Sequence, residues 1–459
     1  VLPTLEAGVK DVLPCLANLT QQAARDSAIG SVYEAYKRYC REKVDRSIDS
    51  VRFILSQSKL STYAPFLSCS ILAFNSEHLD EAIQITESLL AYENELVRRQ
   101  AYVTLAMLDV RPPQTEAVWG LLLKSACAED ESAGRALLLR AILNFGNSFS
   151  PYWPNIEELL LTFNEQASPE LIYEISGILA FQRVDLPERV LELLVGHLVN
   201  VAPEHSGTVH NIDSILVNLI RNGSKSNAVK LLESILLQGV KITNLSYFSH
   251  ELLDKHRELL NHISTKWLLT GDQSLCHSIS NLFLNVAGSD IELEADNELL
   301  NNDVKQVFVV RKAAGWLFLR PISAASFIIS MYDKSSIDAR RELEQVLYDP
   351  LLLSYPGELK RLFQRYLDQG FQVHLCDHLL NKLKAYHSDI EKVSELKELM
   401  APSENINTYW KDSNRRMQAA YKNASKDSII DLIATKQTLL YGNSSIYYVH
   451  HGDGRQVRQ

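Results

Sequence analysis

The stretch NELVRRQAYVTLAML, residues 94–108, has the residue spacing of an amphipathic helix. Apolar side chains recur every three or four residues from Val97 to Leu108, so they share one face of a helix with 3.6 residues per turn. Arg98 and Arg99 begin the polar side of the same helix. The stretch therefore predicts a helix that is buried along one face only.

The same pattern returns along the chain at a nearly constant interval. Similar segments begin at Glu93, Asp130, Ala167 and Ser206, at spacings of 37, 37 and 39 residues. A second series of helical segments begins at Ser76, Gln114, Tyr152, Leu186 and Ser224, at spacings of 38, 38, 34 and 38 residues. Because the two series alternate, each unit of the chain is predicted to be a helix, a turn and a second helix.

Proline and serine stand where these helices are expected to begin. Ser168 is placed as an N-cap, and Pro169 takes the first helical position, where the missing N–H would have no partner in any case. The whole chain of 459 residues holds only 18 glycines and 14 prolines. This is well below average usage, so hairpins and long coil linkers should be scarce.

A helix pair of this size cannot bury its own apolar stripe, but stacking on a neighbouring pair can bury it. A recurring stripe at this period is typical of an extended repeat protein rather than a compact globule. We therefore expect an all-α fold, a right-handed α-solenoid built from helix-turn-helix repeats of about 37 residues.

Two segments make the resemblance more specific. VRRQAYVTL, residues 97–105, resembles the second-helix signature of HEAT repeats, and VVRKAAGWLF, residues 309–318, is similar to it. In HEAT proteins the arginine of this signature stabilises neighbouring repeats through polar contacts, which implies such a role for Arg98. The arginine recurs 37 residues later as Arg135, whereas the third unit has Ile172 at that position.

The chain divides into five regions on these patterns. Residues 1–60 are expected to form an N-terminal helical cap, 61–240 HEAT-like repeats, and 241–302 an irregular helical and acidic segment that includes GSDIELEADNELLNND. Residues 303–400 are expected to form further HEAT-like helix pairs, and 401–459 C-terminal helices and a tail. Within that tail, residues 446–449 have the composition of a short strand.

Composition narrows the function classes. Acidic residues outnumber basic ones by 56 to 46, and this net charge weakens non-specific attraction to nucleic acid or an anionic membrane. The six cysteines are scattered without paired spacing, which fits reduced thiols in a cytoplasmic protein. No run of 18 apolar residues is present, so we expect no membrane span.

The strongest metal-like string is HLCDHLL, in which His374, Asp377 and His378 share one face of a helix. It lacks the usual third ligand, and Leu375 follows His374 where the H-E-x-x-H pattern has its glutamate. An ordinary amphipathic helix, with Leu375 and its apolar neighbours facing a core, explains the same residues without a metal. We expect no metal, no cofactor and no catalytic site, although YYVHHGDG near the C-terminus leaves an enzyme as a third hypothesis.

The leading hypothesis is a non-catalytic scaffold that binds a protein or peptide partner along a concave surface lined by the second helix of each repeat. The candidate contact residues are Arg98, Arg99, Arg135 and Arg140. The alternative is a HEAT-like protein that binds nucleic acid or processes bases, because basic and aromatic residues are interleaved after residue 311. Its candidate residues are Arg311, Lys312, Lys360, Arg361, Arg415 and Arg416.

Overall fold

A computed structural model describes residues 2–22, 30–74, 78–162, 168–181, 186–283, 291–394, 403–425, 435–441, 444–450 and 456–458. The chain divides into two compact units, Val1–Leu359 and Lys360–Gln459. Each unit is described separately below.

The regular elements among the first unit's described residues are all helices. Its N-terminal part contains α1 (Val9–Gln22), α2 (Gly30–Arg41), α3 (Val44–Leu55), α4 (Leu60–Tyr63), α5 (Pro65–Ile71) and α6 (Leu79–Leu90). The middle part contains α7 (Glu95–Met107), α8 (Thr115–Ala128), α9 (Ser132–Ser148), α10 (Trp153–Thr162), α11 (Pro169–Phe181), α12 (Glu188–Leu198), α13 (Ser206–Arg221) and α14 (Lys225–Leu237). The last part contains α15 (Ser246–Lys255), α16 (Arg257–Thr270), α17 (Gln273–Leu282), α18 (Asp303–Trp316), α19 (Pro321–Met331) and α20 (Ile337–Val346).

Helix α7 forms where the sequence pattern predicts it. Asn94 is its N-cap, and the side-chain oxygen accepts a hydrogen bond from the backbone N–H of Leu96 at 3.0 Å. Val97 and Ala101 are fully buried, and Leu105 is almost so. Helix α11 likewise confirms its predicted start, because the Ser168 hydroxyl accepts from the backbone N–H of Leu171 and Pro169 is the first helical residue.

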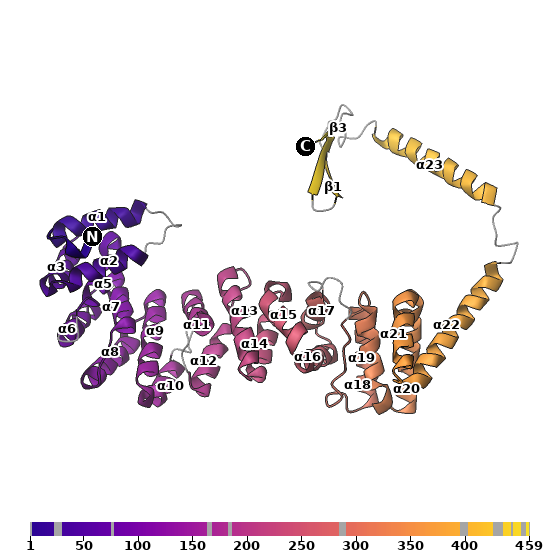
Figure 1. Cartoon of the computed structure of the whole chain (residues 1–459), viewed down its shortest axis with the longest axis horizontal. Helices are drawn as coiled ribbons and strands as arrows, with labels where there is room; N and C mark the ends of the chain where they lie inside the picture. Colours follow the sequence, from indigo (N-terminus) through magenta and orange to yellow (C-terminus); the bar gives the residue numbers. More distant parts are fainter. Residues whose placement is uncertain are drawn as a thin grey trace. The chain divides into compact units, whose positions relative to one another are not determined.

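Alternate helices pack side by side through the first unit. Helices α7, α9, α11, α13 and α15 each contact the next in that order, α10 contacts α12, and α12 contacts α14. Further along, α16 contacts α18, and α18 contacts α20. Figure 1 shows these helices in chain order along the unit. Each apolar stripe is therefore covered by neighbouring helices rather than by one central core.

The acidic segment before α18 is an excursion without regular structure over residues 291–302. Side chains of the packed helices hold its backbone: the N–H of Leu293 donates to the Ser326 hydroxyl, and that of Ala295 donates to the Ser330 hydroxyl. The backbone N–H of Asp296 donates to the hydroxyl of Thr265. These bonds satisfy backbone groups that have no ladder or helix of their own.

The second unit contains most of α21 (Pro356–Asp368), followed by α22 (Val373–Ser394) and α23 (Ser403–Ser425). Three strands follow, β1 (Thr435–Tyr441), β2 (Ser444–His450) and β3 (Gln456–Arg458), and they pair antiparallel in the order β1-β2-β3. The strand expected at residues 446–449 lies within β2. The region expected as C-terminal helices and a tail contains α23 and then these three strands, which follow the all-helical part of the chain. No helix in the described ranges has an apolar stretch that could span a membrane.

Candidate protein-binding surface

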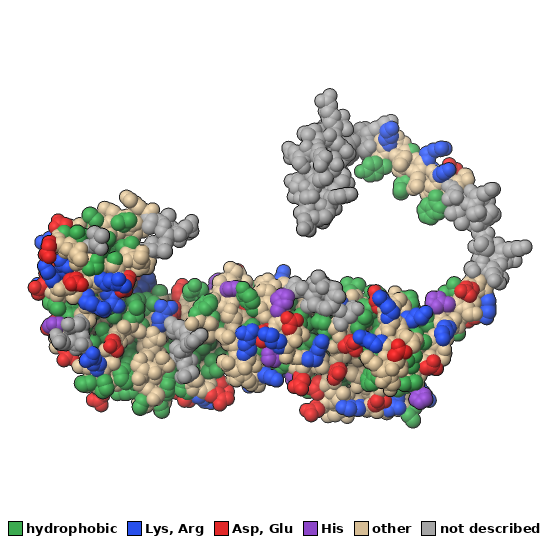
Figure 2. All heavy atoms as spheres, in the orientation of Figure 1, with side chains coloured by type: hydrophobic (Ala, Val, Ile, Leu, Met, Phe, Trp, Pro, Cys, Tyr) green, Lys and Arg blue, Asp and Glu red, His purple; other side chains and the backbone are tan. Residues whose placement is uncertain are grey.

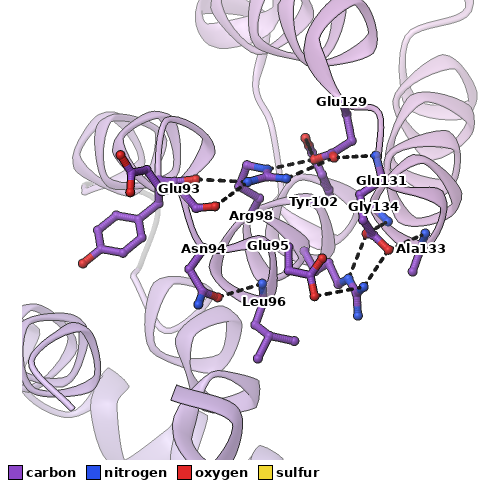
Figure 3. Close-up of polar contacts among 12 residues, drawn as sticks. Glu93, Asn94, Glu95, Leu96, Arg98, Tyr102, Glu129, Glu131, Ala133 and Gly134 are labelled. Atoms are coloured by element: carbon purple, nitrogen blue, oxygen red, sulfur yellow. Dashed lines mark hydrogen bonds and ion pairs between the residues drawn. The ribbon is translucent and has the colours of Figure 1, made fainter. Parts of the chain in front are cut away.

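Arg98 does not point freely from its helix but joins α7 to the turn before α9 (Figure 3). Its Nε and a terminal nitrogen donate to the two carboxylate oxygens of Glu129 at 3.0 and 3.2 Å. The Tyr102 hydroxyl and the backbone N–H of Glu131 donate to the same carboxylate at 2.8 and 3.0 Å. Burial alone would raise the pKa of Glu129, but these donors together lower it. The carboxylate therefore stays ionised between the helices.

Arg99 makes a second link of the same kind. Its guanidinium donates to both oxygens of Glu131 at 3.0 and 2.6 Å. Glu131 is also the N-cap of α9, since its carboxylate accepts from the backbone N–H groups of Ala133 and Gly134. The residue thus ties α7 to the positive end of the α9 dipole.

Pairs of this type recur through the first unit. Each joins one helix to the helix two places along the chain, or to the turn before it, with partners 30 to 34 residues apart in sequence. The pairs are Arg98–Glu129, Arg99–Glu131, Arg140–Glu174, Arg189–Glu157, Arg221–Glu251, Lys266–Glu233 and Arg311–Glu342. A search for basic and acidic residues at this separation would have found them in the sequence.

The four residues proposed for partner contact therefore lie in different settings. Arg98 and Arg99 keep only 22% and 27% of their side chains exposed. Arg140 pairs with Glu174 of α11, and 40% of its side chain is exposed. Arg135 is half-buried on α9. Arg140 therefore exposes more of its side chain to a partner than Arg98 or Arg99 does.

The residues proposed for nucleic-acid contact are divided between the two units. In the first unit Arg311 donates to Glu342 at 2.8 Å, and the Lys312 ammonium lies 5.4 Å from the centre of the Phe308 ring. In the second unit Lys360 and Arg361 are exposed on α21. Arg415 and Arg416 are exposed on α23, where Arg415 lies 3.8 Å from Asp412.

Sequence patterns did not reveal a groove between α18 and α20. It encloses about 940 Å³, and Val304, Val307, Phe308 and Ala339 provide its apolar lining. Val304 is 80% exposed and Phe308 is 40% exposed, and in the groove they form a contiguous apolar patch. A single-sequence pattern does not show such a groove, because its lining comes from two helices that meet only in the folded unit.

Two contacts fix the shape of this groove. The Ser336 hydroxyl donates to the Asp303 carboxylate at 2.6 Å, so the N-terminal ends of α18 and α20 lie together. The Arg311–Glu342 pair joins the same helices further along, so the two run parallel. Gly271 ends α16 with φ of +66°, and a Cβ built there would lie 3.1 Å from the Phe308 ring. The backbone at Gly271 therefore packs closely against the Phe308 ring.

The metal-like string of α22 is presented to solvent. His374, Asp377 and His378 are exposed, whereas Leu375 and Leu379 are buried. The Asp377 carboxylate accepts from the amide of Asn381 at 3.0 Å. No group of three or more potential metal ligands occurs among the described residues. His451 lies outside the described residues.

Three buried cysteines are poor nucleophiles in this setting. Burial raises the pKa of the Cys40, Cys276 and Cys376 thiols to about 11. A thiol with this pKa stays protonated at neutral pH, and the thiolate is the reactive form. These side chains serve as small apolar packing groups.

No family model, no curated protein and no solved structure matches the chain. Any functional conclusion therefore rests on the residues and contacts described above.

Proposed function

We propose that the chain is a HEAT-like solenoid that acts as a non-catalytic scaffold for a protein partner. Four helices of the series that carries the first HEAT-like signature begin at Glu95, Ser132, Pro169 and Ser206, which are 37 residues apart. The ion pairs between alternate helices support the same repeat. Such stacking preorganises a long surface, so a partner can bind without the cost of ordering it.

The observation that carries this proposal is the groove between α18 and α20. Helix α18 contains most of the second HEAT-like signature, so the groove belongs to the series proposed to line the concave surface. Its apolar lining is open to solvent, because Val304 is 80% exposed and Phe308 is 40% exposed. A surface of this kind on a soluble body is typical of a protein-binding site.

The preferred partner element is an amphipathic helix. Two parallel helices leave a groove that a third helix can fill with residues at i, i+3 or i+4 and i+7. Charges of both signs surround the apolar lining, with Asp303 at one end and the Arg311–Glu342 pair at the other. Figure 2 shows basic and acidic side chains interspersed over the helices of this part of the first unit. This favours a helix with mixed charges over a polyanion.

The test uses the full chain and a partner captured from extract, identified and then purified. Val304→Glu places a charge in the apolar lining and is expected to raise the dissociation constant at least tenfold. Leu237→Glu is the matched control, because Leu237 is 55% exposed at the end of α14 and outside the groove. Equal binding by wild type, Val304→Glu and Leu237→Glu would contradict the groove as the binding site.

Nucleic-acid binding is the second candidate, and α23 is the element that favours it. Trp410 and Tyr421 are 59% and 79% exposed on this helix, close in sequence to the exposed Arg415 and Arg416. Aromatic rings stack on bases, and arginines contact phosphates. Binding of a single-stranded oligonucleotide should then weaken log-linearly with salt, and Arg415→Ala with Arg416→Ala should reduce that slope. A flat salt response would exclude this candidate.

A further inference from the structure

Residues 291–296 of the acidic excursion have the alternation of an extended chain. Ile291, Leu293 and Ala295 are each no more than 8% exposed, whereas Glu294 is exposed. Side chains of an extended backbone point alternately to opposite faces. The segment, which we call the strap, therefore turns one face toward the helices and the other toward the surface.

One edge of the strap is bonded to α19. Three serine hydroxyls of this helix, at i, i+3 and i+7, make the bonds from one helix face. The pairs are Ser323 donating to the carbonyl of Ile291, Ser326 accepting from the N–H of Leu293 at 2.9 Å, and Ser330 accepting from the N–H of Ala295 at 2.8 Å. The strap therefore runs along α19 in the direction of the helix.

The other edge of the strap is bonded to α16. Here the helix residues are four positions apart and their partners in the strap are two apart. The pairs are Arg257 donating to the carbonyl of Glu292 at 3.2 Å, Asn261 accepting from the N–H of Glu294 at 3.1 Å, and Thr265 accepting from the N–H of Asp296 at 2.8 Å. A helix rises about 6 Å in four residues and an extended chain about 6.6 Å in two, so the two spacings agree.

These six side chains, which we call the ladder, hold the strap by its backbone. Every residue from 291 to 296 gives a main-chain group to the ladder, the odd-numbered residues to α19 and the even-numbered ones to α16. Extended peptides are bound in this way, with affinity from main-chain hydrogen bonds and specificity from pockets for alternate side chains. The ladder is therefore suited to any extended segment with the right side chains.

The side chains of the strap define that specificity. The odd positions are apolar and buried, so a charged residue there would lose its hydration. At the even positions the Nδ1 atom of His262 lies 2.7 Å from the Asp296 carboxylate, and Arg257 lies on the same helix. The ladder therefore selects apolar residues at alternate positions with acidic residues between them.

The chain that follows the strap is held separately by α18. Gln306 donates to the carbonyl of Leu300 at 3.1 Å, and Lys305 donates to the Asn301 side chain at 3.0 Å. Leu300 is 2% exposed. These contacts do not involve the ladder, so they hold residues 300 and 301 in place whether or not the ladder holds the strap.

We propose that the ladder is a binding site for an extended segment of a partner protein, with alternating apolar and acidic residues, and that the strap occupies this site in the free chain. A tethered segment has an effective concentration on the order of mM, so a partner segment competes with the strap rather than meeting an empty site. The ladder is separate from the groove between α18 and α20 and takes an extended chain instead of a helix.

The test uses a labelled synthetic peptide with the sequence of residues 291–298, IELEADNE, and the full chain, measured by fluorescence anisotropy. Leu293→Asp in the chain puts a charge at a fully buried position of the strap and leaves the ladder unchanged. This variant is expected to bind the peptide at least tenfold more tightly than the wild type. Adding Asn261→Ala to it should reverse that gain. Glu298→Gln is the matched control, because Glu298 is exposed in the same excursion but outside the strap.

Equal peptide binding by the wild type and a Leu293→Asp chain that keeps its helical circular dichroism would overturn the inference. If that variant loses its helices, the wild type decides: excess peptide should accelerate hydrogen exchange at the N–H groups of Leu293 and Ala295, and unchanged exchange would overturn the inference. Val304→Glu should leave peptide binding intact, and Asn261→Ala should leave the helical partner bound, so either proposal can fail alone.

Discussion

The Glu129 carboxylate accepts four hydrogen bonds while only 1% of its side chain is exposed. Arg98 supplies two of these bonds and the only full positive charge among the donors. A buried carboxylate that loses its cation keeps the desolvation cost without the compensating attraction. Arg98 therefore belongs to the packing between α7 and α9, as the HEAT resemblance implies for this arginine.

We predict that Arg98→Ala lowers the free energy of unfolding by about 2–3 kcal/mol, less than for a fully buried pair because the arginine is partly exposed. Arg99→Ala is the control, with an expected loss of about 1 kcal/mol or less, since Glu131 still accepts backbone hydrogen bonds. Chemical denaturation of both variants measures the difference. Equal losses in the free energy of unfolding would show that the burial of Glu129 does not determine how much Arg98 stabilises the fold.

The Glu251 carboxylate should make the stability of the fold depend on pH in the acid range. Hydrogen bonds from Arg221 and then Lys255 outweigh burial and lower its pKa to about 2 in the folded chain. In the unfolded chain its pKa is about 4.3. A depressed folded pKa contributes stability that is present above the unfolded value and is lost as pH falls toward the folded value.

We therefore predict that wild type is more stable than Glu251→Gln near pH 6 and that this advantage shrinks as pH falls from about 4 toward 2. Thermal melting of both chains over this range gives the measurement. A constant difference in melting temperature across the range would mean that the ionised carboxylate contributes nothing.

At the scale of single elements the sequence was a good guide to the repeat helices. Asn94 and the Ser168-Pro169 pair mark helix starts through local side-chain hydrogen bonding, which depends only on neighbouring residues. The strands β1 and β3 were missed because their pairing with β2 joins separate segments of the chain, which a reading of each segment alone does not reveal. Helix starts could therefore be predicted from neighbouring residues, whereas the pairing of the strands is seen only in the structure.

Alanine substitutions at two helical glycines separate the effect of helix propensity from the effect of packing. Gly177→Ala should raise the free energy of unfolding by about 0.5–1 kcal/mol, because alanine favours the helix and its methyl group meets no atom. Gly146→Ala should lower it by about 1–3 kcal/mol, because the methyl group would lie 2.6 Å from Ile156 and 2.8 Å from Trp153. Calorimetric unfolding of both variants would contradict this account if the two shifts had the same sign.

At the scale of the whole molecule the sequence predicted many helices with a periodic apolar pattern, but it did not predict the candidate site. The period depends on apolar residues that recur along the sequence, so it is visible before folding. The groove between α18 and α20 depends on residues from two helices, about 30 to 40 positions apart, which the packing of these helices brings together.

The same stacking predicts how damage spreads through the first unit. Ala101 is fully buried where α7 meets its neighbours, so Ala101→Asp buries a charge and should cost about 3 kcal/mol or more locally. In a chain of nearest-neighbour contacts the disturbed helices open first, while distant ones keep their partners. Hydrogen exchange should therefore accelerate in α5, α7 and α9 and stay slow in α18 and α20.

Met107→Asp is the control for this experiment, because Met107 ends the same helix and is 62% exposed. It should leave exchange close to that of the wild type throughout. If Ala101→Asp instead accelerated exchange in α18 and α20 as much as in α7, the first unit would unfold as a single cooperative core. That outcome would contradict the solenoid, and with it the reason for expecting a preorganised surface on these helices.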